Sequence, residues 1–249
     1  MSRKVALVTG GTKRIGSAIS DRLASAGYAL VIHGRDPREA EAKATELRMM
    51  GARAASIAGD LADLDGLTIL MEAASMPFGP PDVLVNNASL FAKDDLATLD
   101  SQQFTANLAV NLQAPVLLAK AFAAQLPEGE TGAIINLIDQ RVFRVNPHFF
   151  SYTLAKAALY TATKTLAQAL APRGIRVNGV GPGPVLPNLH DGTDAFALEA
   201  AGTPLGRAVR VGEIAEAVLF LAEAEAVTGQ MLAVDSGQHL GWQTPDIVA

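Results

Sequence analysis

The chain has 249 residues, of which 49% are hydrophobic and 18% are charged, so it can bury a large core. Its formal net charge is −5 and no run of basic residues stands out, which argues against nucleic acid as a partner. It has no cysteine, which excludes disulfides, thiolate catalysis and the common zinc clusters, and its four histidines show no metal-ligand spacing.

The N-terminal part of the chain carries one short apolar run, at 5–8. This run is too short for a secretory signal segment or a membrane span, and it fits a buried strand. We therefore expect a cytoplasmic protein that does not enter a membrane.

Strand and helix patterns alternate along the chain, and the strand runs are continuously apolar, which is typical of a parallel sheet covered on both faces. Strands are predicted at 4–9, 29–33, 54–58, 83–86, 133–138, 176–180 and 230–234. Helices are predicted at 15–26, 37–50, 64–74, 101–126, 152–171 and 211–222. The pattern predicts the α/β class, with a doubly wound parallel seven-stranded sheet (a Rossmann fold) in a single domain over 1–249.

The first predicted strand leads into a glycine-rich turn, Thr9-Gly10-Gly11-Thr12-Lys13-Arg14-Ile15-Gly16. Glycines here let backbone amides approach a pyrophosphate at the positive end of the following helix. Such junctions also use glycine without a ligand, but a position at the start of an α/β chain favours a dinucleotide site. The residues expected to bind the cofactor here are Gly10, Thr12, Lys13, Arg14 and Ile15.

The end of the second predicted strand, Gly34-Arg35-Asp36-Pro37, bears on the choice between NAD and NADP. A carboxylate at this place often binds the ribose 2′-hydroxyl of NAD. Asp36, however, precedes a proline suited to the first helical position, so we interpret it as a helix N-cap. Arg35 can then bind a 2′-phosphate, with Arg14 nearby, because guanidinium groups match phosphate well. The sequence favours NADPH.

Polar residues also follow the third and fourth predicted strands. Asp60-Leu61 could cap a helix or bind the adenine amino group. Asn86 and Asn87 could bridge neighbouring strand ends or reach a ribose, since a turn explains one asparagine more easily than two.

Tyr152 and Lys156 are four residues apart at the start of a predicted helix, so they share one face. A lysine ammonium close to a phenol stabilises the phenolate, and we expect it to lower the pKa of Tyr152 from about 10 towards working pH. Such a tyrosine can donate a proton to a carbonyl or imine while hydride arrives from the cofactor.

A second pair, Tyr160 and Lys164, has the same spacing. Ligands of an open parallel sheet bind at the carboxyl ends of the strands, where the following helix begins. Tyr160 lies about 12 Å further along the helix than Tyr152. We therefore predict Tyr152 and Lys156 as the catalytic pair, and the second pair as packing and surface residues.

Asp139 and Asn111 are two further polar residues near the predicted cleft. Asp139 stands at the end of the fifth predicted strand, where a carboxylate points into the cleft; the alternative is a turn residue. Asn111 interrupts an apolar helix at some cost in propensity. It either kinks that helix or holds a water near the lysine, and we favour the second.

One long stretch, 181 to about 206, is predicted to be irregular because it is rich in proline and glycine. Long loops in a compact domain are usually functional, so we predict a substrate lid at about 183–206. The C-terminal segment Gln238-His239-Leu240-Gly241-Trp242 could close the site, also from a neighbouring subunit, or pack at an interface.

Together these residues resemble the short-chain dehydrogenase/reductase family over essentially the whole chain. The match includes the glycine turn, Asp60, the Asn87 motif, Asn111, Tyr152-x-x-x-Lys156, Pro182-Gly183 and the ending Thr228-Gly229-Gln230 to Val234-Asp235-Ser236-Gly237. The resemblance implies that Tyr152 is the proton donor and that Lys156 binds the nicotinamide ribose and tunes Tyr152. It also implies a proton relay supported by Asn111, and it adds to the cofactor site Leu61, Asn87, Ala88, Ser89, Pro182, Gly183 and Val185.

Two positions depart from most of that family, which has glycine where this chain has Arg14 and serine where it has Asp139. With Ser89 and Phe91 they resemble the pteridine reductase branch. That branch combines a Lys-Arg turn, an Asn-Ala-Ser motif, an aromatic residue two positions on, and an aspartate thirteen residues before the tyrosine. There the pterin lies between nicotinamide and the aromatic ring, so Phe91 would stack on it and Arg14 would touch cofactor phosphate and pterin.

The resemblance implies NADPH-dependent reduction of a small molecule: a dihydropterin, dihydromonapterin or dihydrofolate to the tetrahydro form. Tyr152 or Asp139 would supply protons. The alternative is an NADPH-dependent reductase of another carbonyl, such as a 3-oxoacyl thioester, a sugar or another ketone, which the aspartate at 139 disfavours. A third hypothesis is a module that senses NADPH without turnover. The small-residue helices at 108–126 and 152–171 suit a homo-oligomer, either a tetramer or a dimer.

Overall fold

The computed structural model of the chain describes residues 4–187 and 192–242. Seven strands form one sheet in the order β3-β2-β1-β4-β5-β6-β7, and every neighbouring pair is parallel. The order reverses between β1 and β4, which opens the crevice where such sheets bind ligands. The predicted doubly wound seven-stranded sheet is confirmed. Its strands are β1 (Val5–Val8), β2 (Ala29–Gly34), β3 (Ala54–Ala58), β4 (Val83–Asn86), β5 (Gly132–Leu137), β6 (Ile175–Pro182) and β7 (Met231–Val234).

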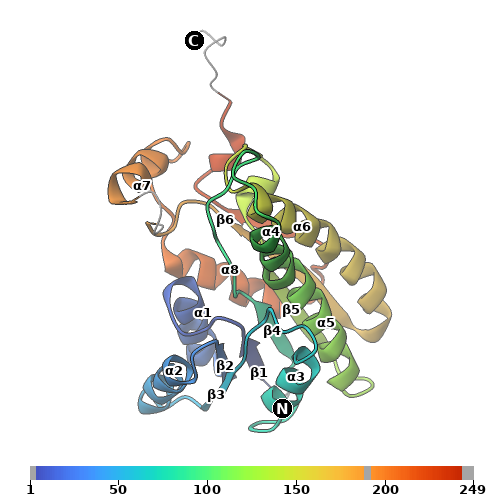
Figure 1. Cartoon of the computed structure of the whole chain (residues 1–249). Coiled ribbons are helices and arrows are strands. Elements are labelled where there is room, and N and C mark those ends of the chain that lie inside the picture. Colours follow the sequence, from blue (N-terminus) through green and yellow to red (C-terminus); the bar gives the residue numbers. More distant parts are fainter. Residues whose placement is uncertain (1–3, 188–191, 243–249) are drawn as a thin grey trace.

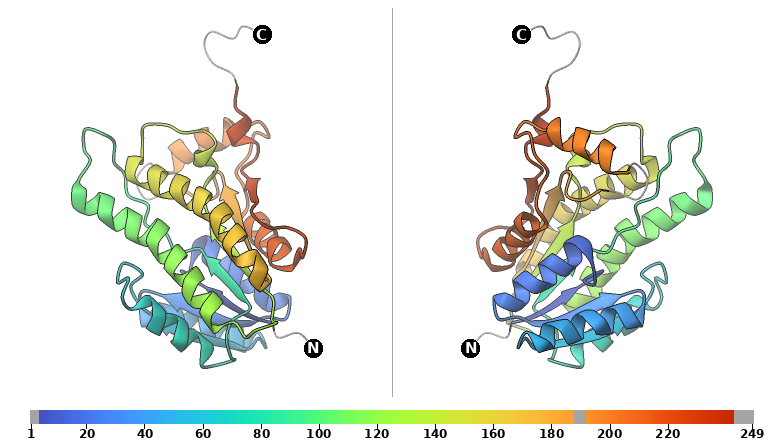
Figure 2. Two further views of the ribbon diagram at one scale, coloured as in Figure 1. Left: turned by 90° about the vertical axis from the view of Figure 1, so that its right-hand side faces the viewer. Right: turned by 90° about the vertical axis from the view of Figure 1, so that its left-hand side faces the viewer.

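Helices cover both faces of the sheet (Figures 1 and 2). One face packs against α1 (Arg14–Ser25), α2 (Pro37–Met49) and α8 (Val211–Glu223). The other packs against α3 (Leu67–Ser75), α5 (Ala114–Gln125) and α6 (Phe150–Leu170). Both faces of β1 are buried: Ala6 and Val8 belong to the first core cluster, Val5 and Leu7 to the second. Within the described ranges, no helix is both long enough and apolar enough to span a membrane.

The helix predicted as one unit at 101–126 is interrupted. It consists of α4 (Ser101–Leu108), a π-helical turn η1 (Ala109–Gln113) and α5. Pro115 explains the break, because it lacks the N–H that would donate to the carbonyl of Asn111 four residues earlier. Asn111 lies within this turn, so the helix is distorted at that residue. The favoured role, holding a water near the lysine, stays a prediction.

The stretch 181–206 is more regular than its composition predicts. β6 runs to Pro182, and α7 (Gly192–Ala201) forms a helix of 10 residues. The prediction of an irregular stretch was therefore wrong for this part. The run from Ala195 to Ala201 is rich in alanine and has good helix propensity, but the glycines and prolines on both sides masked it. Figure 1 shows α7 apart from the sheet, above α1 and α2.

Candidate active site

A cavity of about 1300 Å³ opens at the carboxyl ends of the strands, and it gathers the predicted site. Every residue predicted for catalysis, cofactor or substrate lines it, except Asn111. These lining residues are Gly10, Thr12, Lys13, Arg14, Ile15, Gly34, Arg35, Asp60, Leu61, Asn87, Ala88, Ser89, Phe91, Asp139, Tyr152, Lys156, Pro182, Gly183 and Val185. The cavity is also lined by residues that sequence analysis did not assign, among them His33, Gln140, Arg141, Phe196 and Glu199.

The glycine turn is shaped by close contacts that exclude side chains. Gly10 has a φ of +60°, and a Cβ on Gly16 would lie 2.0 Å from the carbonyl oxygen of Gly10. Lys13 is the N-cap of α1, and its side chain makes no capping hydrogen bond. The first backbone amides of α1 therefore have no side-chain acceptor from the N-cap residue. Free amides at the positive end of a helix, beside Lys13 and Arg14, suit a diphosphate. This end of the cavity therefore fits a dinucleotide.

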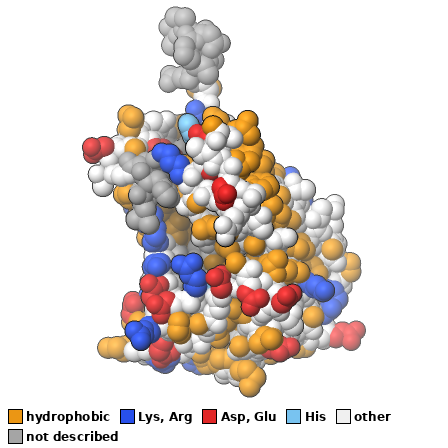
Figure 3. Space-filling view, viewed as in Figure 1, with side chains coloured by type: hydrophobic (Ala, Val, Ile, Leu, Met, Phe, Trp, Pro, Cys, Tyr) orange, Lys and Arg blue, Asp and Glu red, His pale blue; other side chains and the backbone are white. Residues whose placement is uncertain are grey.

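The far end of the cavity carries four basic side chains, Lys13, Arg14, Arg35 and Arg38, beside the acidic Asp36 and Glu39. Lys13 pairs with Glu39 at 3.1 Å. On the face shown in Figure 3, Lys and Arg side chains gather between α7 and the side of the molecule formed by α1 and α2. Asp36 caps α2 by accepting from the amide of Arg38 at 2.7 Å, as predicted. Guanidinium groups at the cavity wall match the 2′-phosphate that separates NADP from NAD.

Asp60 and Asn87 hold turns at the cavity wall. Asp60 accepts from the amide of Ala62 at 2.9 Å, which closes a turn and caps no helix, since α3 begins at Leu67. The side-chain amide of Asn87 donates to the carbonyl oxygens of Thr9 and Gly10, both at 2.9 Å. Of the two roles considered for Asn87, the bridge between strand ends is the one observed.

Tyr152, Asp139 and Lys156 form a buried polar group at the cavity floor. The Tyr152 hydroxyl donates to a carboxylate oxygen of Asp139 at 3.0 Å. The Lys156 ammonium donates to the carbonyl oxygen of Leu137 at 2.6 Å and lies 5.5 Å from the centre of the Tyr152 ring. Asp139 also accepts from the amide of Arg141, so it caps a short turn and faces the cavity at once.

Burial and mutual charge set the ionisation of this group. Burial raises the pKa of Tyr152 well above its usual range, and the Asp139 carboxylate raises it further. Burial also raises the pKa of Asp139, against the opposing charge of Arg141. Burial lowers the pKa of Lys156 to about 8, although Asp139 opposes this. The predicted lowering of the Tyr152 pKa was therefore wrong, because burial and the Asp139 carboxylate outweigh the opposing charge of Arg141.

Phe91 presents an aromatic surface beside Tyr152. Its ring stacks on Phe149 with centroids 4.1 Å apart and planes 12° from parallel, and it meets the Tyr152 ring edge-on at 4.8 Å. The Arg141 guanidinium lies 5.3 Å from the Phe149 ring. Phe149 has a φ of +55° at the N-cap of α6 and is buried, so Phe91 rests on a fixed aromatic support at the cavity wall.

Asn111 acts on the cavity through the segment after β4. Its side-chain oxygen accepts from the Ser89 hydroxyl at 2.8 Å and from the amide of Leu90 at 3.2 Å. Its nitrogen donates to the carbonyl oxygen of Leu90 at 2.8 Å and to Asn107 at 3.1 Å. These bonds fix the place of Ser89, which lines the cavity together with Tyr152.

Asp94 is a buried residue that sequence analysis missed. Its carboxylate accepts from the amide of Ser151 at 3.2 Å through each oxygen and from the hydroxyl of Ser151. Its own carbonyl accepts from the amide of Phe150 at 3.4 Å. Asp94 therefore caps the first turn of α6, directly before Tyr152. An aspartate inside an irregular segment gives no signal for a cap on a helix 56 residues away in the chain.

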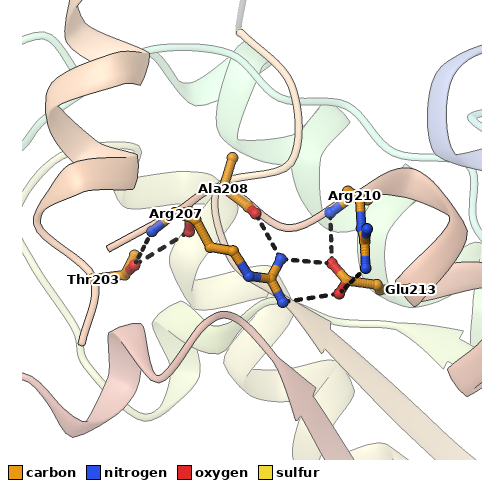
Figure 4. A network of polar contacts seen from close by, with 5 residues as sticks. All are labelled: Thr203, Arg207, Ala208, Arg210 and Glu213. Carbon is orange, nitrogen blue, oxygen red and sulfur yellow. Dashed lines mark hydrogen bonds and ion pairs between the residues drawn. The ribbon is translucent and has the colours of Figure 1, made fainter. Parts of the chain in front are cut away.

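Polar contacts anchor the segment that follows α7 (Figure 4). Arg207 forms a two-bonded ion pair with Glu213, at 2.8 and 2.9 Å, and Arg210 binds the same carboxylate. These arginines lower the pKa of Glu213 to about 2. Thr203 binds both backbone groups of Arg207, at 3.2 Å each. The base of α7 is therefore tied to the start of α8.

The C-terminal segment contacts α7 of its own chain. The Gln238 side chain donates to Glu199 at 2.8 Å, and both residues line the cavity. Buried Asp235 holds His239 through its amide and its ring, at 2.8 and 2.7 Å. This segment therefore lies at the edge of the site in its own chain, and closure of the site or packing at an interface stays a prediction.

The second tyrosine-lysine pair lies away from the cavity. The Lys164 ammonium is 4.0 Å from the centre of the Tyr160 ring, and Phe143 packs against that ring edge-on at 5.5 Å. Neither member lines the cavity, as predicted. The described residues also contain no cluster of three or more His, Asp or Glu that could hold a metal ion.

Known proteins resemble this chain over nearly all its length. Residues 10–239 match the family model described as enoyl-(acyl carrier protein) reductase. The crystal structure of FolM alternative dihydrofolate reductase 1 from Brucella canis, complexed with NADP, superposes with a TM-score of 0.93. It shares 46% sequence identity, over 98% of this chain and 97% of that one.

Two relatives with other activities also match. Cis-4-hydroxycyclohexanecarboxylate dehydrogenase of Sinomonas cyclohexanicum is 36% identical, over 95% of this chain and 96% of its own length. The 3-oxoacyl-[acyl-carrier-protein] reductase FabG of Staphylococcus aureus is 33% identical, over 95% of this chain and 98% of its own.

Proposed function

The chain belongs to the short-chain dehydrogenase/reductase family, and we propose that within it the protein is a pterin reductase. It is an NADP-dependent oxidoreductase. Its proposed reaction is the reduction of a dihydropterin, dihydromonapterin or dihydrofolate to the tetrahydro form. The observation that carries the proposal is the buried contact of Asp139 with Tyr152, 3.0 Å apart, beside the ring of Phe91.

The residues present fit NADPH along the whole cavity. The amides of the glycine turn would bind the diphosphate, and Arg14 and Arg35 would bind the 2′-phosphate. Lys156, on the cavity floor, would bind the nicotinamide ribose. When bound, the cofactor supplies a hydride. A Cβ on Gly16 would collide with the carbonyl oxygen of Gly10, so only glycine lets α1 begin this close to the turn.

Phe91 would orient the substrate. A flat heterocycle stacks well on an aromatic face, and this ring is held by Phe149 behind it and by the edge of Tyr152. Such a substrate would lie over the side chains that carry protons. Arg14 lines the same cavity. Its guanidinium donates to the carbonyl oxygen of Pro187 at 3.0 Å, so it lies beside the segment that follows β6.

Tyr152 and Asp139 would supply the proton. Reduction of a C=N bond adds a hydride to carbon and a proton to the adjacent nitrogen. Burial raises the pKa of both groups above their ordinary values, which favours the protonated form of each. The Tyr152 hydroxyl would donate to the ring nitrogen, and Asp139, in hydrogen-bond contact, would pass its own proton to the phenolate oxygen.

The second candidate function is reduction of another carbonyl, such as a 3-oxoacyl thioester. The match to the Staphylococcus aureus FabG favours it. Tyr152 and Lys156 would serve a ketone equally well, but a carboxylate at 139 would place negative charge beside the carbonyl oxygen. A module that binds NADPH without turnover leaves the buried Tyr152–Asp139 contact without a use.

Two further features belong to this proposal. The segment 183–206, which includes α7, would act as a lid over the substrate, since Phe196 and Glu199 of α7 line the cavity. Hydrophobic side chains gather over α4 and α6 in Figure 3, which supports a homo-oligomer formed through these helices. A cytoplasmic location stays a prediction.

NADPH oxidation by the purified protein tests the proposed function. Dihydropterins and dihydrofolate are compared with acetoacetyl thioester and simple ketones at equal concentration. We expect rapid turnover of a dihydropterin and little turnover of the carbonyl compounds. Turnover of carbonyl compounds alone would reject the pterin substrate and support the second candidate.

A further inference from the structure

His33 lies at the cofactor end of the cavity, and no role has been assigned to it so far. It stands near the end of β2, is 2% exposed, and lines the cavity. β2 lies between β1 and β3 in the sheet. The ring of His33 therefore sits between the turn after β1, which carries the glycines, and the turn after β3, which carries Gly59 and Asp60.

Both ring nitrogens of His33 have backbone partners in these two turns. The amide of Gly10 donates to Nδ1 at 3.3 Å, and Nε2 lies 3.1 Å from the carbonyl oxygen of Gly59. A carbonyl oxygen can only accept and an amide can only donate, so the partners require a neutral ring with its proton on Nε2. Burial lowers the pKa of His33, against the charge of Asp60, which keeps the ring neutral at working pH.

Backbone hydrogen bonds continue from the sheet into the first residues of both turns. The amide of Gly11 donates to the carbonyl oxygen of His33 at 3.0 Å, and that of Gly59 donates to Gly34 at 3.3 Å. Beyond these bonds both turns leave the sheet. The His33 ring then links the two turns. It reaches the glycine turn at Gly10, where φ is +60° and where the close approach of Gly16 restricts the backbone.

We propose that His33 is a positioning residue for the cofactor, which holds the diphosphate-binding turn and the Gly59–Asp60 turn at the spacing that NADPH needs. The inference rests on the cofactor part of the proposed function and not on the pterin substrate. Both ring nitrogens of His33 bond protein backbone, so the ring would act on NADPH through the two turns. A ligand held by two turns loses affinity when their spacing is free to vary.

Three substitutions separate the two contacts. In His33→Asn the side-chain oxygen can replace Nδ1 and accept from Gly10. In His33→Gln the side-chain nitrogen can replace Nε2 and donate to Gly59. His33→Leu removes both. Exposed His148 lies outside the cavity, so His148→Leu is the matched control.

The dissociation constant of NADPH is measured without substrate, from the fluorescence of the reduced nicotinamide, so the result does not depend on turnover. We expect His33→Leu to raise this constant at least about tenfold, as loss of buried hydrogen bonds implies. His33→Asn and His33→Gln should each recover part of the loss, and His148→Leu should bind as the wild type does.

Thermal unfolding of the cofactor-free variants shows whether each is folded at the assay temperature. Wild-type NADPH affinity in folded His33→Leu would overturn the proposal. Equal weakening in all three variants would also overturn it, because a bracing role predicts partial rescue. If the NADPH dissociation constants change as expected but the wild type does not turn over a pterin, the pterin substrate is rejected and the role of His33 stands.

Discussion

The hydroxyl group of Tyr152 lies 3.0 Å from a carboxylate oxygen of Asp139 at the floor of the cavity, where Tyr152 is buried and Asp139 is partly buried. Burial raises the pKa of Tyr152, and the close negative charge of Asp139 opposes ionisation of the phenol and raises it further. The Tyr152 hydroxyl therefore keeps its proton at neutral pH. A reductase that must protonate a ring nitrogen can use such a proton donor, whereas Lys156 alone would favour the phenolate.

Tyr152→Phe removes the hydroxyl and keeps the ring. We expect turnover to fall at least about 100-fold, within the usual range for an acid-base group. NADPH binding should stay intact, because the hydroxyl bonds Asp139 and not the glycine turn. Steady-state rates and NADPH titration check this. Tyr160→Phe is the matched control, and a near-normal rate for Tyr152→Phe would contradict the assignment.

Asp139→Ser separates pterin from ketone reduction. Serine can hydrogen-bond Tyr152 but holds no acidic proton, so pterin turnover should fall more than turnover of a simple ketone. The pH profile gives a second readout. The pKa of Asp139 is raised by burial, so its protonated form is present at low pH and is lost as pH rises through that value. The fall in pterin rate with rising pH should be absent in Asp139→Ser; equal effects on both substrates would count against a special role.

Motifs that act within one stretch of chain could be predicted, and contacts between distant stretches could not. The glycine turn, the Asp36 cap and the Tyr152–Lys156 pair have local spacings, and the structure brings them to one cavity. The two ring contacts of His33, on β2, join the turn after β1 to the turn after β3, and no spacing in the sequence reports them. The pKa of Tyr152 was mispredicted for the same reason, since burial depends on the whole fold.

The two differences between the predicted and observed helices, the break at 109–113 and the helix α7, have local causes that can be found in the sequence. The proline at 115 removes one helical hydrogen bond and places a π-turn at Asn111. An alanine-rich run inside a region of prolines and glycines forms α7.

Phe91→Leu keeps an apolar side chain and removes the aromatic face. The KM for a dihydropterin should rise about tenfold, because stacking between aromatic rings contributes about 0.5–1.5 kcal/mol beyond area burial. NADPH affinity should be unchanged, and turnover of a small ketone should change little. Steady-state kinetics on both substrates check the split. An unchanged KM for the pterin would show that another surface orients the ring.

Asp94→Ala tests the link between the segment after Phe91 and the catalytic helix. The carboxylate caps Ser151, one residue before Tyr152, so its loss leaves buried donors at the start of α6 without partners. We expect unfolding free energy to fall by about 1–3 kcal/mol, as for an unsatisfied buried group. Since Tyr152 follows directly, kcat should fall about tenfold while NADPH affinity is kept.

Asp95→Ala is the control for this prediction. Asp95 lies next in the chain, but its carboxylate binds only Thr98 and Ala97 in a local turn. It should alter kcat little. If Asp94→Ala lowers stability and leaves kcat unchanged at a temperature where it is folded, the cap is structural and does not position Tyr152.

Arg14→Gly sets stability against binding at one residue. Arg14 has a φ of +53°, in the left-handed region that costs a residue with a side chain roughly 1–2 kcal/mol and costs glycine little. Two effects oppose this gain: the larger entropy of the unfolded chain with glycine, and the lost hydrogen bond to Pro187. The free energy of unfolding of Arg14→Gly should therefore stay close to that of the wild type.

The same substitution removes a guanidinium from the cavity wall. NADPH affinity should fall at least about tenfold while NADH affinity changes less, because Arg14 would meet the 2′-phosphate. Titration of both nucleotides and a melting curve check the two halves. Arg22→Gln removes the same charge from the outer side of α1, where Arg22 pairs with Glu216, and should leave both affinities unchanged. Equal weakening toward NADPH and NADH in Arg14→Gly would place the guanidinium at the diphosphate instead, and a large drop in melting temperature would show that the arginine is held by contacts that outweigh its backbone strain.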